Sequence, residues 1–488
     1  MGFEVTDLEA DKLHEECGVI GIYAPDSDVA QLTYYGLYAL QHRGQESAGI
    51  AVANGKAING EKGVGLVSEV FQDTSKFKRL QGQIAVGHVL YAADVSSLPA
   101  NVQPLMMRYR NGHLAIVHNG QLVNGQQLRL QLENEGSIFQ TTSDSEVMAH
   151  LIARSGETDI VAAVKKSLLS LQGAHTYLLM TPNKLIGARD PHGFRPLSLG
   201  KTSHGYVLAS ETCAFDSIGA EFVRDIEPGE LVVIDQDGVH AEYFTKPAKQ
   251  ALCIFEFIYF ARPDSNIHGR NVHLVRKRLG RRLAQEHPVE ADIVTGVPDS
   301  SLSAASGVAE ELGLPYEMGF IKNRYIGRTF IKPAQEIRAL GVRLKLNAVR
   351  QIVEGKRVVM VDDSIVRGTT SMHIVEMLRK AGAKEVHVLI SSPPVVAPCF
   401  YGIDTSSKGE LIAARMTVEE MKEAIGADYL GFLSAEGMLE CTNLAPDGFC
   451  TACFNKQYPI EVNDCPLDKK LIKENDNNGR CSGCVLHV

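Results

Sequence analysis

The stretch Arg357-Val-Val-Met-Val-Asp-Asp-Ser-Ile-Val-Arg-Gly-Thr-Thr-Ser371 decides the fold of the second half of the chain. Its apolar run, residues 358–361, predicts a strand buried on both faces, as in a parallel sheet. Asp362 and Asp363 follow where the strand should end, and a loop rich in Gly and hydroxyl groups then leads into an amphipathic helix. Ligands bind at such strand ends in open α/β sheets. The stretch therefore predicts a ligand site between a buried strand and a helix.

The residues of this loop suit a phosphorylated sugar. Gly368, Thr369 and Thr370 can offer backbone N–H groups and hydroxyls to a phosphate at the helix N-terminus. Asp362 and Asp363 can bind sugar hydroxyls, either directly or through Mg²⁺, which prefers oxygen ligands. An Asp-Asp pair alone would favour an ordinary acidic turn, but the whole string favours the ligand site.

The string resembles the phosphoribosyl pyrophosphate motif of type I phosphoribosyltransferases, in which apolar residues precede Asp-Asp and a Gly-Thr-Thr loop follows. The resemblance implies that the substrate is bound by Asp362, Asp363, Ser364, Arg367, Gly368, Thr369 and Thr370. A second strand end, residues 293–301, looks like the pyrophosphate loop of this fold, and its Ser300 is a further oxygen for Mg²⁺. Lys322 and Arg328, in the cationic segment 322–329, predict a mobile lid that neutralises departing pyrophosphate. An ordinary solvated loop is the alternative.

A cysteine at the head of the first predicted strand marks the N-terminal half. Cys17 begins the apolar stretch Cys17–Tyr23 and follows an acidic leader, residues 1–16. A thiol nucleophile needs a base, and its own α-amine, whose pKa is ordinarily about 7.7–8, can serve if cleavage makes Cys17 the first residue. We therefore expect the leader to be removed. By itself, a cysteine in a strand is more often a packing residue.

Three further stretches, residues 41–50, 117–121 and 142–146, give Cys17 a chemical context. They resemble the glutaminase half of N-terminal-nucleophile amidotransferases. By this resemblance Asn119 and Gly120 form the oxyanion hole, and Asp144 binds the α-amino group of glutamine. An amide and a Gly N–H suit an oxyanion, and a carboxylate suits an ammonium.

Both halves in one chain, in this order, are similar to the amidophosphoribosyltransferases from Cys17 to about Pro459. The resemblance implies that glutamine is hydrolysed through a thioester at Cys17. The ammonia then displaces pyrophosphate from phosphoribosyl pyrophosphate, in the first committed step of purine synthesis. It also implies a homo-oligomer, either a tetramer or a dimer, that is inhibited by purine nucleotides.

The pattern of strands and helices changes near residue 250. Residues 17–250 contain many short strands with Gly, Asn and Asp turns, which predicts an α+β domain of stacked antiparallel sheets with covering helices, here of the N-terminal-nucleophile glutaminase type. Residues 251–440 alternate helices with strands, which predicts an α/β domain with a parallel sheet, here of the type I phosphoribosyltransferase kind. Residues 441–488 form a Cys-rich C-terminal segment.

The chain has ten cysteines, and six of them follow residue 440. It shows no secretory signal, so we expect a cytoplasmic protein whose thiols are reactive or metal-bound. Spacing alone allows a zinc site of Cys450, Cys453, Cys481 and Cys484. The resemblance implies instead a [4Fe–4S] cluster, as in members with a leader peptide, and this interpretation is favoured. Its ligands would be Cys253, Cys399, Cys450 and Cys453, whereas Cys213 is expected to pack.

Composition excludes several classes of partner. The hydrophobic fraction of 44% is typical of a protein with substantial cores, and the net charge of −9 with a pI of 6.0 offers no basic face. Nucleic acid and anionic membranes are therefore not expected as partners. No apolar run is long enough to span a bilayer.

One position of the predicted glutamine pocket departs from the family. In the family an Arg that binds the substrate carboxylate precedes the Tyr of the strand at residues 86–91, but here that position is Leu90. Arg43 is one cation that could replace it. Without a replacement, the same enzyme would work mainly with free ammonia. A non-catalytic sensor of purine nucleotides is a third interpretation, although a sensor needs neither Cys17 nor the cations of the lid.

Overall fold

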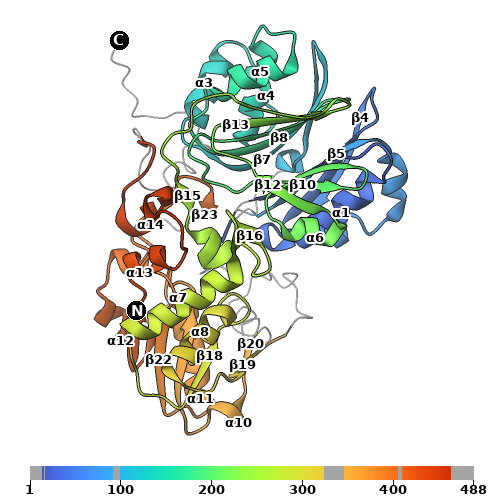
Figure 1. Cartoon of the computed structure of the whole chain (residues 1–488). Helices are drawn as coiled ribbons and strands as arrows, with labels where there is room; N and C mark the ends of the chain where they lie inside the picture. Colours follow the sequence, from blue (N-terminus) through green and yellow to red (C-terminus); the bar gives the residue numbers. More distant parts are fainter. Residues whose placement is uncertain (1–13, 16, 92–98, 324–345, 405–408, 463–488) are drawn as a thin grey trace, which may run out of the picture.

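The computed structural model describes residues 14–15, 17–91, 99–323, 346–404 and 409–462. Two antiparallel sheets form the N-terminal half and a parallel sheet forms the C-terminal half, with the short strands β15, β16 and β23 between them (Figure 1). The predicted succession of an α+β half and an α/β half is confirmed. Within the described parts of the chain, no helix combines the length and the apolar composition that a membrane crossing requires.

The first sheet carries Cys17 at the head of one of its central strands. Its seven strands are antiparallel throughout. Helices α1 (Val29–Ala39), α2 (Val67–Val70) and α6 (Cys213–Ile218) cover its outer face. In order across the sheet, the strands are β12 (Glu221–Asp225), β10 (Ser198–Thr202), β11 (Gly205–Ala209), β2 (Cys17–Tyr23), β5 (Ile84–Leu90), β3 (Ser47–Ala53) and β4 (Ile58–Val64).

The second sheet packs against the inner face of the first. Alternate residues of both sheets, such as Val19 and Val86 from the first and Val117 and Leu178 from the second, form the core between them. Helices α3 (Gly125–Asn134), α4 (Ser145–Arg154) and α5 (Ile160–Leu168) cover the outer face. Its six antiparallel strands are β14 (Gly238–Tyr243), β13 (Glu230–Asp235), β9 (Leu185–Arg189), β8 (Gly173–Met180), β7 (Gly112–Leu122) and β6 (Leu105–Tyr109).

The C-terminal half is built on four parallel strands, in the order β18 (Ile293–Gly296), β21 (Arg357–Asp362), β22 (Glu385–Ile390) and β24 (Tyr429–Phe432). Helices α7 (Val272–Glu286), α8 (Leu302–Leu312) and α13 (Ala435–Glu440) lie on one face. Helices α11 (Thr369–Lys380) and α12 (Val418–Ile425) lie on the other. Both faces are covered, which explains why residues 358–361 are continuously apolar.

Short elements connect these layers. Strand pairs are β1 (His14–Glu15) with β23 (Ile403–Asp404), β15 (Leu252–Cys253) with β25 (Phe449–Cys450), β16 (Asn266–Ile267) with β17 (Arg270–Asn271), and β19 (Phe320–Lys322) with β20 (Leu346–Ala348). Single helical turns are η1 (Gln41–Arg43), η2 (Thr74–Arg79), η3 (Pro99–Asn101), η4 (Glu256–Phe260), α10 (Arg350–Val353), η6 (Ile412–Ala414), η7 (Pro446–Gly448) and α14 (Ala452–Asn455). The pairs β1–β23 and β15–β25 each join segments far apart in the chain.

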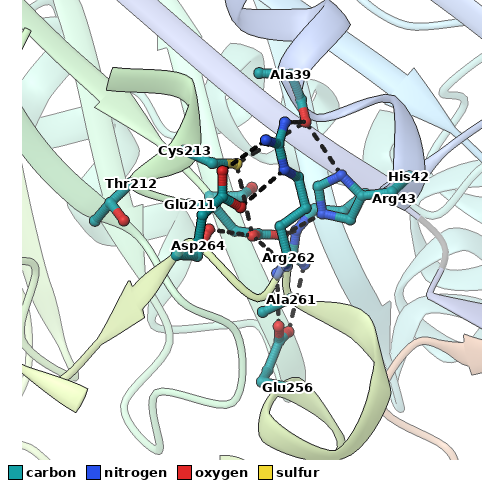
Figure 2. Close-up of polar contacts among 12 residues, drawn as sticks. Ala39, His42, Arg43, Glu211, Thr212, Cys213, Glu256, Ala261, Arg262 and Asp264 are labelled. Carbon is teal, nitrogen blue, oxygen red and sulfur yellow. Dashed lines mark hydrogen bonds and ion pairs between the residues drawn. The ribbon is translucent and has the colours of Figure 1, made fainter. Parts of the chain in front are cut away.

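A buried network of charges joins the two halves (Figure 2). The Arg43 side chain is fully buried and donates through Nε to Glu211, which follows β11. Its Nη2 donates to Glu256 Oε2 at 2.6 Å, and Glu256 begins η4 in the C-terminal half. The guanidinium therefore lies between a carboxylate of each half.

Glu211 is the most heavily bonded carboxylate of this network. It also accepts from His42 Nε2 at 2.6 Å, from the Ser265 hydroxyl at 2.6 Å and from the Arg262 amide at 2.9 Å. Burial alone would raise the pKa of Glu211, but Arg43 and His42 hold it well below its usual range. The carboxylate is therefore ionised at neutral pH.

We expect Arg43→Met to destabilise the protein by about 3–5 kcal/mol, because the substitution leaves two buried carboxylates without their shared cation. The measurement is the shift in the midpoint of thermal or urea unfolding. Arg79→Met is the matched control, since Arg79 is 63% exposed in its ion pair with Glu61 and such pairs contribute about 0–1 kcal/mol. Equal shifts for both variants would contradict the expectation.

Candidate active sites

Cys17 lies at the end of the sandwich of the two sheets. It is the first residue of β2, is 4% exposed, and pairs in register with Leu90 of β5. Leu90 also pairs with Ser47 of β3. Residues paired across antiparallel strands point to the same face, so these three side chains face the second sheet. Strand β2 packs on β7 across the sandwich.

Strand β7 carries the predicted oxyanion hole. Asn119 is buried and lies two residues along the strand from Val117, a member of the core between the sheets, so its side chain faces the same space as Cys17. Gly120 has a φ of +134°, which a side chain would strain. A Cβ at this position would be 2.2 Å from the carbonyl oxygen of Ala174 in β8. Glycine is therefore required here by both conformation and space.

Asp144 immediately precedes α4 and approaches the end of β7. Its Oδ2 accepts a hydrogen bond of 2.8 Å from the Leu122 amide, two residues beyond Gly120. Burial raises the pKa of the Asp144 carboxyl to about 6, so it is mostly ionised at neutral pH. His118 Nδ1 is 3.7 Å away, but burial lowers the pKa of His118 to about 3, so this ring is neutral. The structure thus brings Asn119, Gly120 and Asp144 to one end of β7, which packs on the strand of Cys17.

The expectation that Arg43 could replace the missing Arg at position 90 is wrong. The Arg43 side chain is fully buried, and its guanidinium forms ion pairs with Glu211 and Glu256. Such a guanidinium is not available to a substrate carboxylate. The sequence could not reveal this, because the carboxylates come from residues 168 and 213 positions further along the chain.

The second site is built from two loops at the carboxyl ends of neighbouring parallel strands. Asp362 ends β21, and both Asp362 and Asp363 are 1% exposed. The loop between β18 and α8 supplies two hydroxyls: Ser300 donates to Asp363, and Ser301 donates to Asp362 at 2.9 Å. The predicted set of Ser300, Asp362 and Asp363 is therefore together in space.

The loop after Asp363 leads into α11 as the phosphate motif requires. Gly368 is the residue before the helix and has a φ of +84°. The helix begins at Thr369, so Thr369 and Thr370 lie in its first turn. Ser364 is buried and donates to Asp363 Oδ1 at 2.8 Å. These residues present a helix N-terminus next to the paired carboxylates.

The structure describes two of the three cations predicted for this site, Arg367 and Lys322. Arg367 forms an ion pair of 2.9 Å with Glu410, and Lys322, at the end of β19, forms one of 3.1 Å with Asp299. Arg328 and most of the predicted lid lie outside the described residues. Both placed cations therefore bind carboxylates of the chain itself in this structure.

Two residues near Asp362 and Asp363 were missed by sequence reasoning. Ser301 follows Ser300 directly, and its hydroxyl could have been chosen as readily. Arg276 lies on the buried face of α7, donates to the Phe257 and Ala261 carbonyls at 2.8 Å, and is electrostatically coupled to Asp363. Burial lowers the pKa of Arg276 to about 10, and Asp363 partly offsets this effect. An Arg among the apolar positions of an amphipathic helix was the available signal.

Four cysteines line one small cavity together with Tyr401 and Tyr458: they are Cys253, Cys399, Cys450 and Cys453. The parallel pair β15–β25 places Cys253 opposite Cys450. Burial raises the pKa of Cys450 to about 12 and those of Cys253 and Cys453 well above the usual thiol value. Across the described ranges, no three His, Cys, Asp or Glu side chains are grouped as ligands of a single metal ion. Cys465, Cys481 and Cys484 lie outside these ranges.

Comparison with known proteins agrees with the two kinds of domain. Residues 92–217 match a family of glutamine amidotransferase domains, and residues 270–392 match a family of phosphoribosyl transferase domains. The amidophosphoribosyltransferase of Bacillus subtilis (strain 168) is 57% identical over 455 residues, which is 92% of this chain and 95% of that protein. The enzyme of the same name from Synechocystis sp. is 52% identical over 97% of both chains.

A solved structure extends this similarity to three dimensions. It is the glutamine phosphoribosylpyrophosphate amidotransferase of B. subtilis in complex with ADP and GMP, and it superposes with a TM-score of 0.88 at 56% identity. The match covers 92% of this chain and 99% of that one. Identity and coverage of this extent leave one conclusion: the chain belongs to the amidophosphoribosyltransferase family.

Proposed function

We propose that this enzyme hydrolyses glutamine at Cys17 and transfers the ammonia to phosphoribosyl pyrophosphate at Asp362 and Asp363. The products are glutamate, pyrophosphate and 5-phosphoribosylamine, in the first committed step of purine synthesis. The observation that carries the proposal is the pairing of two different sites in one chain. One is a buried thiol facing an Asn-Gly strand end, and the other is a strand-end carboxylate pair beside a helix N-terminus.

At the first site, the Cys17 thiolate attacks the amide carbon of glutamine. The tetrahedral oxyanion accepts hydrogen bonds from the Asn119 side chain and the Gly120 amide, and Asp144 binds the substrate ammonium. Collapse of the intermediate breaks the C–N bond and releases ammonia, and water then hydrolyses the thioester to glutamate. The α-amine of Cys17, which is free only after residues 1–16 are removed, takes the thiol proton and then donates it to the nitrogen that leaves as ammonia.

The leader therefore has to be cleaved before glutamine is used. His14 and Glu15 form β1, which ends two residues before Cys17 and pairs with β23 of the C-terminal half. Intact-mass analysis of the active enzyme should find a chain that begins at Cys17.

At the second site, Asp362 and Asp363 bind the ribose hydroxyls, and Ser364, Gly368, Thr369 and Thr370 hold the 5-phosphate with Arg367. Ser300, Asp362 and Asp363 are hard oxygen donors already in mutual contact, and such donors fit Mg²⁺. When bound, Mg²⁺ would neutralise the pyrophosphate group. Ammonia forms a bond to ribose C1 as the bond to pyrophosphate breaks, and Lys322 and Arg328 balance the charge of the leaving group.

The cavity of Cys253, Cys399, Cys450 and Cys453 fits a [4Fe–4S] cluster better than zinc. All four donors are thiols, which iron–sulfur clusters prefer, and Arg195 lies close enough to favour the thiolate forms of Cys253 and Cys450. The zinc alternative takes two of its four ligands, Cys481 and Cys484, from outside the described residues, whereas all four ligands of the cluster line this one cavity. Its role would be structural, since none of the four lies in a phosphate or glutamine motif.

The remaining proposals concern inhibition by nucleotides, oligomeric state and location in the cell. The B. subtilis enzyme binds ADP and GMP in its solved structure. We expect purine nucleotides to inhibit this chain as well, and we expect a cytoplasmic homo-oligomer. The sensor interpretation loses its support, because the relatives with the same two domains are named as enzymes.

A pyrophosphate-release assay, run first with glutamine and then with ammonium, tests the reaction. Asp363→Asn should lower the glutamine-dependent and the ammonia-dependent rates by more than about a hundredfold. The loss of a group that only supports a metal ligand already costs about 10–100-fold, and Asp363 is proposed to contact the substrate and Mg²⁺ directly. Cys17→Ser should abolish only the glutamine-dependent rate. Asp292→Asn is the matched control, because Asp292 lies at the opposite end of the same sheet and pairs with Arg357. Ammonia-dependent transfer that survived Asp363→Asn would disprove the site assignment.

Metal analysis tests the cysteine cavity. We expect iron and acid-labile sulfide in equal amounts, about four of each per chain. Cys399→Ser should remove both and lower the unfolding midpoint, whereas Cys213→Ser, a matched buried cysteine beside Glu211, should retain them. Zinc without sulfide would instead assign the site to Cys450, Cys453, Cys481 and Cys484.

A second candidate function is the same transfer driven mainly by free ammonia. The observation that favours it is Leu90, which lies opposite Cys17 and offers no donor to a substrate carboxylate. An Arg–carboxylate pair contributes about 1.5–3 kcal/mol, so its loss should weaken glutamine binding roughly ten- to a hundredfold. The thioester chemistry is not affected, because Cys17, Asn119 and Gly120 are in place.

Leu90→Arg should therefore lower the Michaelis constant for glutamine and leave ammonia-dependent turnover unchanged. Leu90→Met is the matched control, because it keeps the volume and adds no cation. Steady-state kinetics with each nitrogen source would distinguish the two. A wild-type enzyme that saturates at micromolar glutamine and gains nothing from Leu90→Arg would show that another group binds the carboxylate.

A further inference from the structure

The backbone of the C-terminal half reaches the predicted oxyanion hole at Gly402. Gly402 is buried, has a φ of +92°, and directly precedes β23. A Cβ built on it would be 3.0 Å from both Cα and the carbonyl carbon of Gly120, and 3.2 Å from the Gln121 nitrogen. Those distances are below ordinary van der Waals contact, so a side chain at this position would displace the backbone of Gly120 by a few tenths of an ångström and would strain the positive φ of residue 402.

Gly120 has no room to move away from Gly402. On its other side it pairs with His175 of β8, and the Ala174 carbonyl lies where its own Cβ would be. Strand β8 is a central strand of the second sheet, held between β7 and β9. The peptide of Gly120 is therefore enclosed between β8 and the backbone of Gly402.

The residue before Gly402 is held by the glutaminase half. The carbonyl of this residue, Tyr401, accepts a hydrogen bond of 3.0 Å from Arg195 Nη2. The Tyr401 ring stacks on Phe194 at a centroid distance of 4.4 Å. Close packing transmits small displacements, so a shift at Gly402 reaches Gly120.

We propose that Gly402 is a positioning residue for glutamine hydrolysis, through which the transferase half fixes the Gly120 N–H of the oxyanion hole. The inference rests on the proposed roles of Asn119 and Gly120. An oxyanion donor acts only when it points at the position that the oxyanion will occupy, within a narrow range of distance. A displaced Gly120 amide would impair the transition state and leave the binding of glutamine by Asp144 nearly intact.

Gly402→Ala tests the proposal. We expect kcat for glutamine hydrolysis to fall about 10²–10³-fold, as for the loss of one oxyanion-hole donor, with KM for glutamine changed less than about threefold. Ammonia-dependent pyrophosphate release should be unchanged. Gly426→Ala is the matched control, because Gly426 also has a positive φ, +74°, but a Cβ there meets nothing within 4 Å. It should leave both rates unchanged.

Asn119→Ala, alone and combined with Gly402→Ala, separates this proposal from the role of the oxyanion hole. If Gly402 acts through the hole, the two effects on kcat should be far from additive. Unchanged hydrolysis in Asn119→Ala would disprove the oxyanion hole itself. A large loss in Asn119→Ala, together with a Gly402→Ala variant that behaves like Gly426→Ala, would overturn the role of Gly402.

A second variant covers the case in which Gly402→Ala does not fold. Phe194→Leu removes the ring stacked on Tyr401 and leaves the backbone of Gly402 unaltered. It should lower kcat for glutamine hydrolysis several-fold at unchanged KM, because Tyr401 and Gly402 then have a looser support. An unchanged kcat in this variant would also overturn the proposal.

Discussion

Arg43 places a fully buried guanidinium between Glu211 of the glutaminase half and Glu256 of the transferase half. A buried charge without a partner is very unfavourable, so these groups are stable only when the two halves are docked. The stem of Arg43 also packs against Gly18, the residue after the proposed nucleophile, where a Cβ would be 3.3 Å from Arg43 Cβ. One side chain thus holds the strand of Cys17 and the start of the transferase half in a fixed relation.

The same network continues toward the other parts of the interface. Arg195 lies 3.6 Å from Glu256 and donates to the carbonyl of Tyr401, next to Gly402. Arg195 is also electrostatically coupled to Cys253 and Cys450 in the cysteine cavity. The charges that join the halves therefore also fix the segment that contacts Gly120, and they lie beside the proposed cluster. The role proposed for Gly402 makes glutamine chemistry depend on a contact that the glutaminase half cannot make alone.

The two candidate active sites differ in how many of the expected binding groups they contain. The transferase site has its carboxylates, hydroxyls and helix N-terminus in contact. The glutaminase site contains the proposed nucleophile, oxyanion donors and amino-binding carboxylate, but Leu90 lies opposite Cys17. This asymmetry would change how tightly glutamine binds while leaving the transfer step itself unaltered.

Local patterns in the sequence were sufficient for the architecture and for most of the site residues. Alternating and continuous apolar runs have the periods of half-buried and fully buried strands, so both fold classes and most element positions could be predicted. Asp362 and Asp363 could be placed because a strand end and the following loop are contiguous in the chain. The start of a helix depends on local capping contacts: α7 begins at Val272 because the Asn271 side chain accepts a hydrogen bond from the Leu274 amide.

Contacts between distant segments could not be read from the sequence. The sequence by itself determined the two halves and their order, and it supplied the candidate nucleophile, the candidate phosphate loop and the Leu at position 90. Only the tertiary structure decided that Arg43 forms ion pairs with Glu211 and Glu256, that Gly402 contacts Gly120, and that four dispersed cysteines line one cavity. The physical reason is that periodicity and local motifs report on neighbours along the chain, whereas these partners are set by how layers pack.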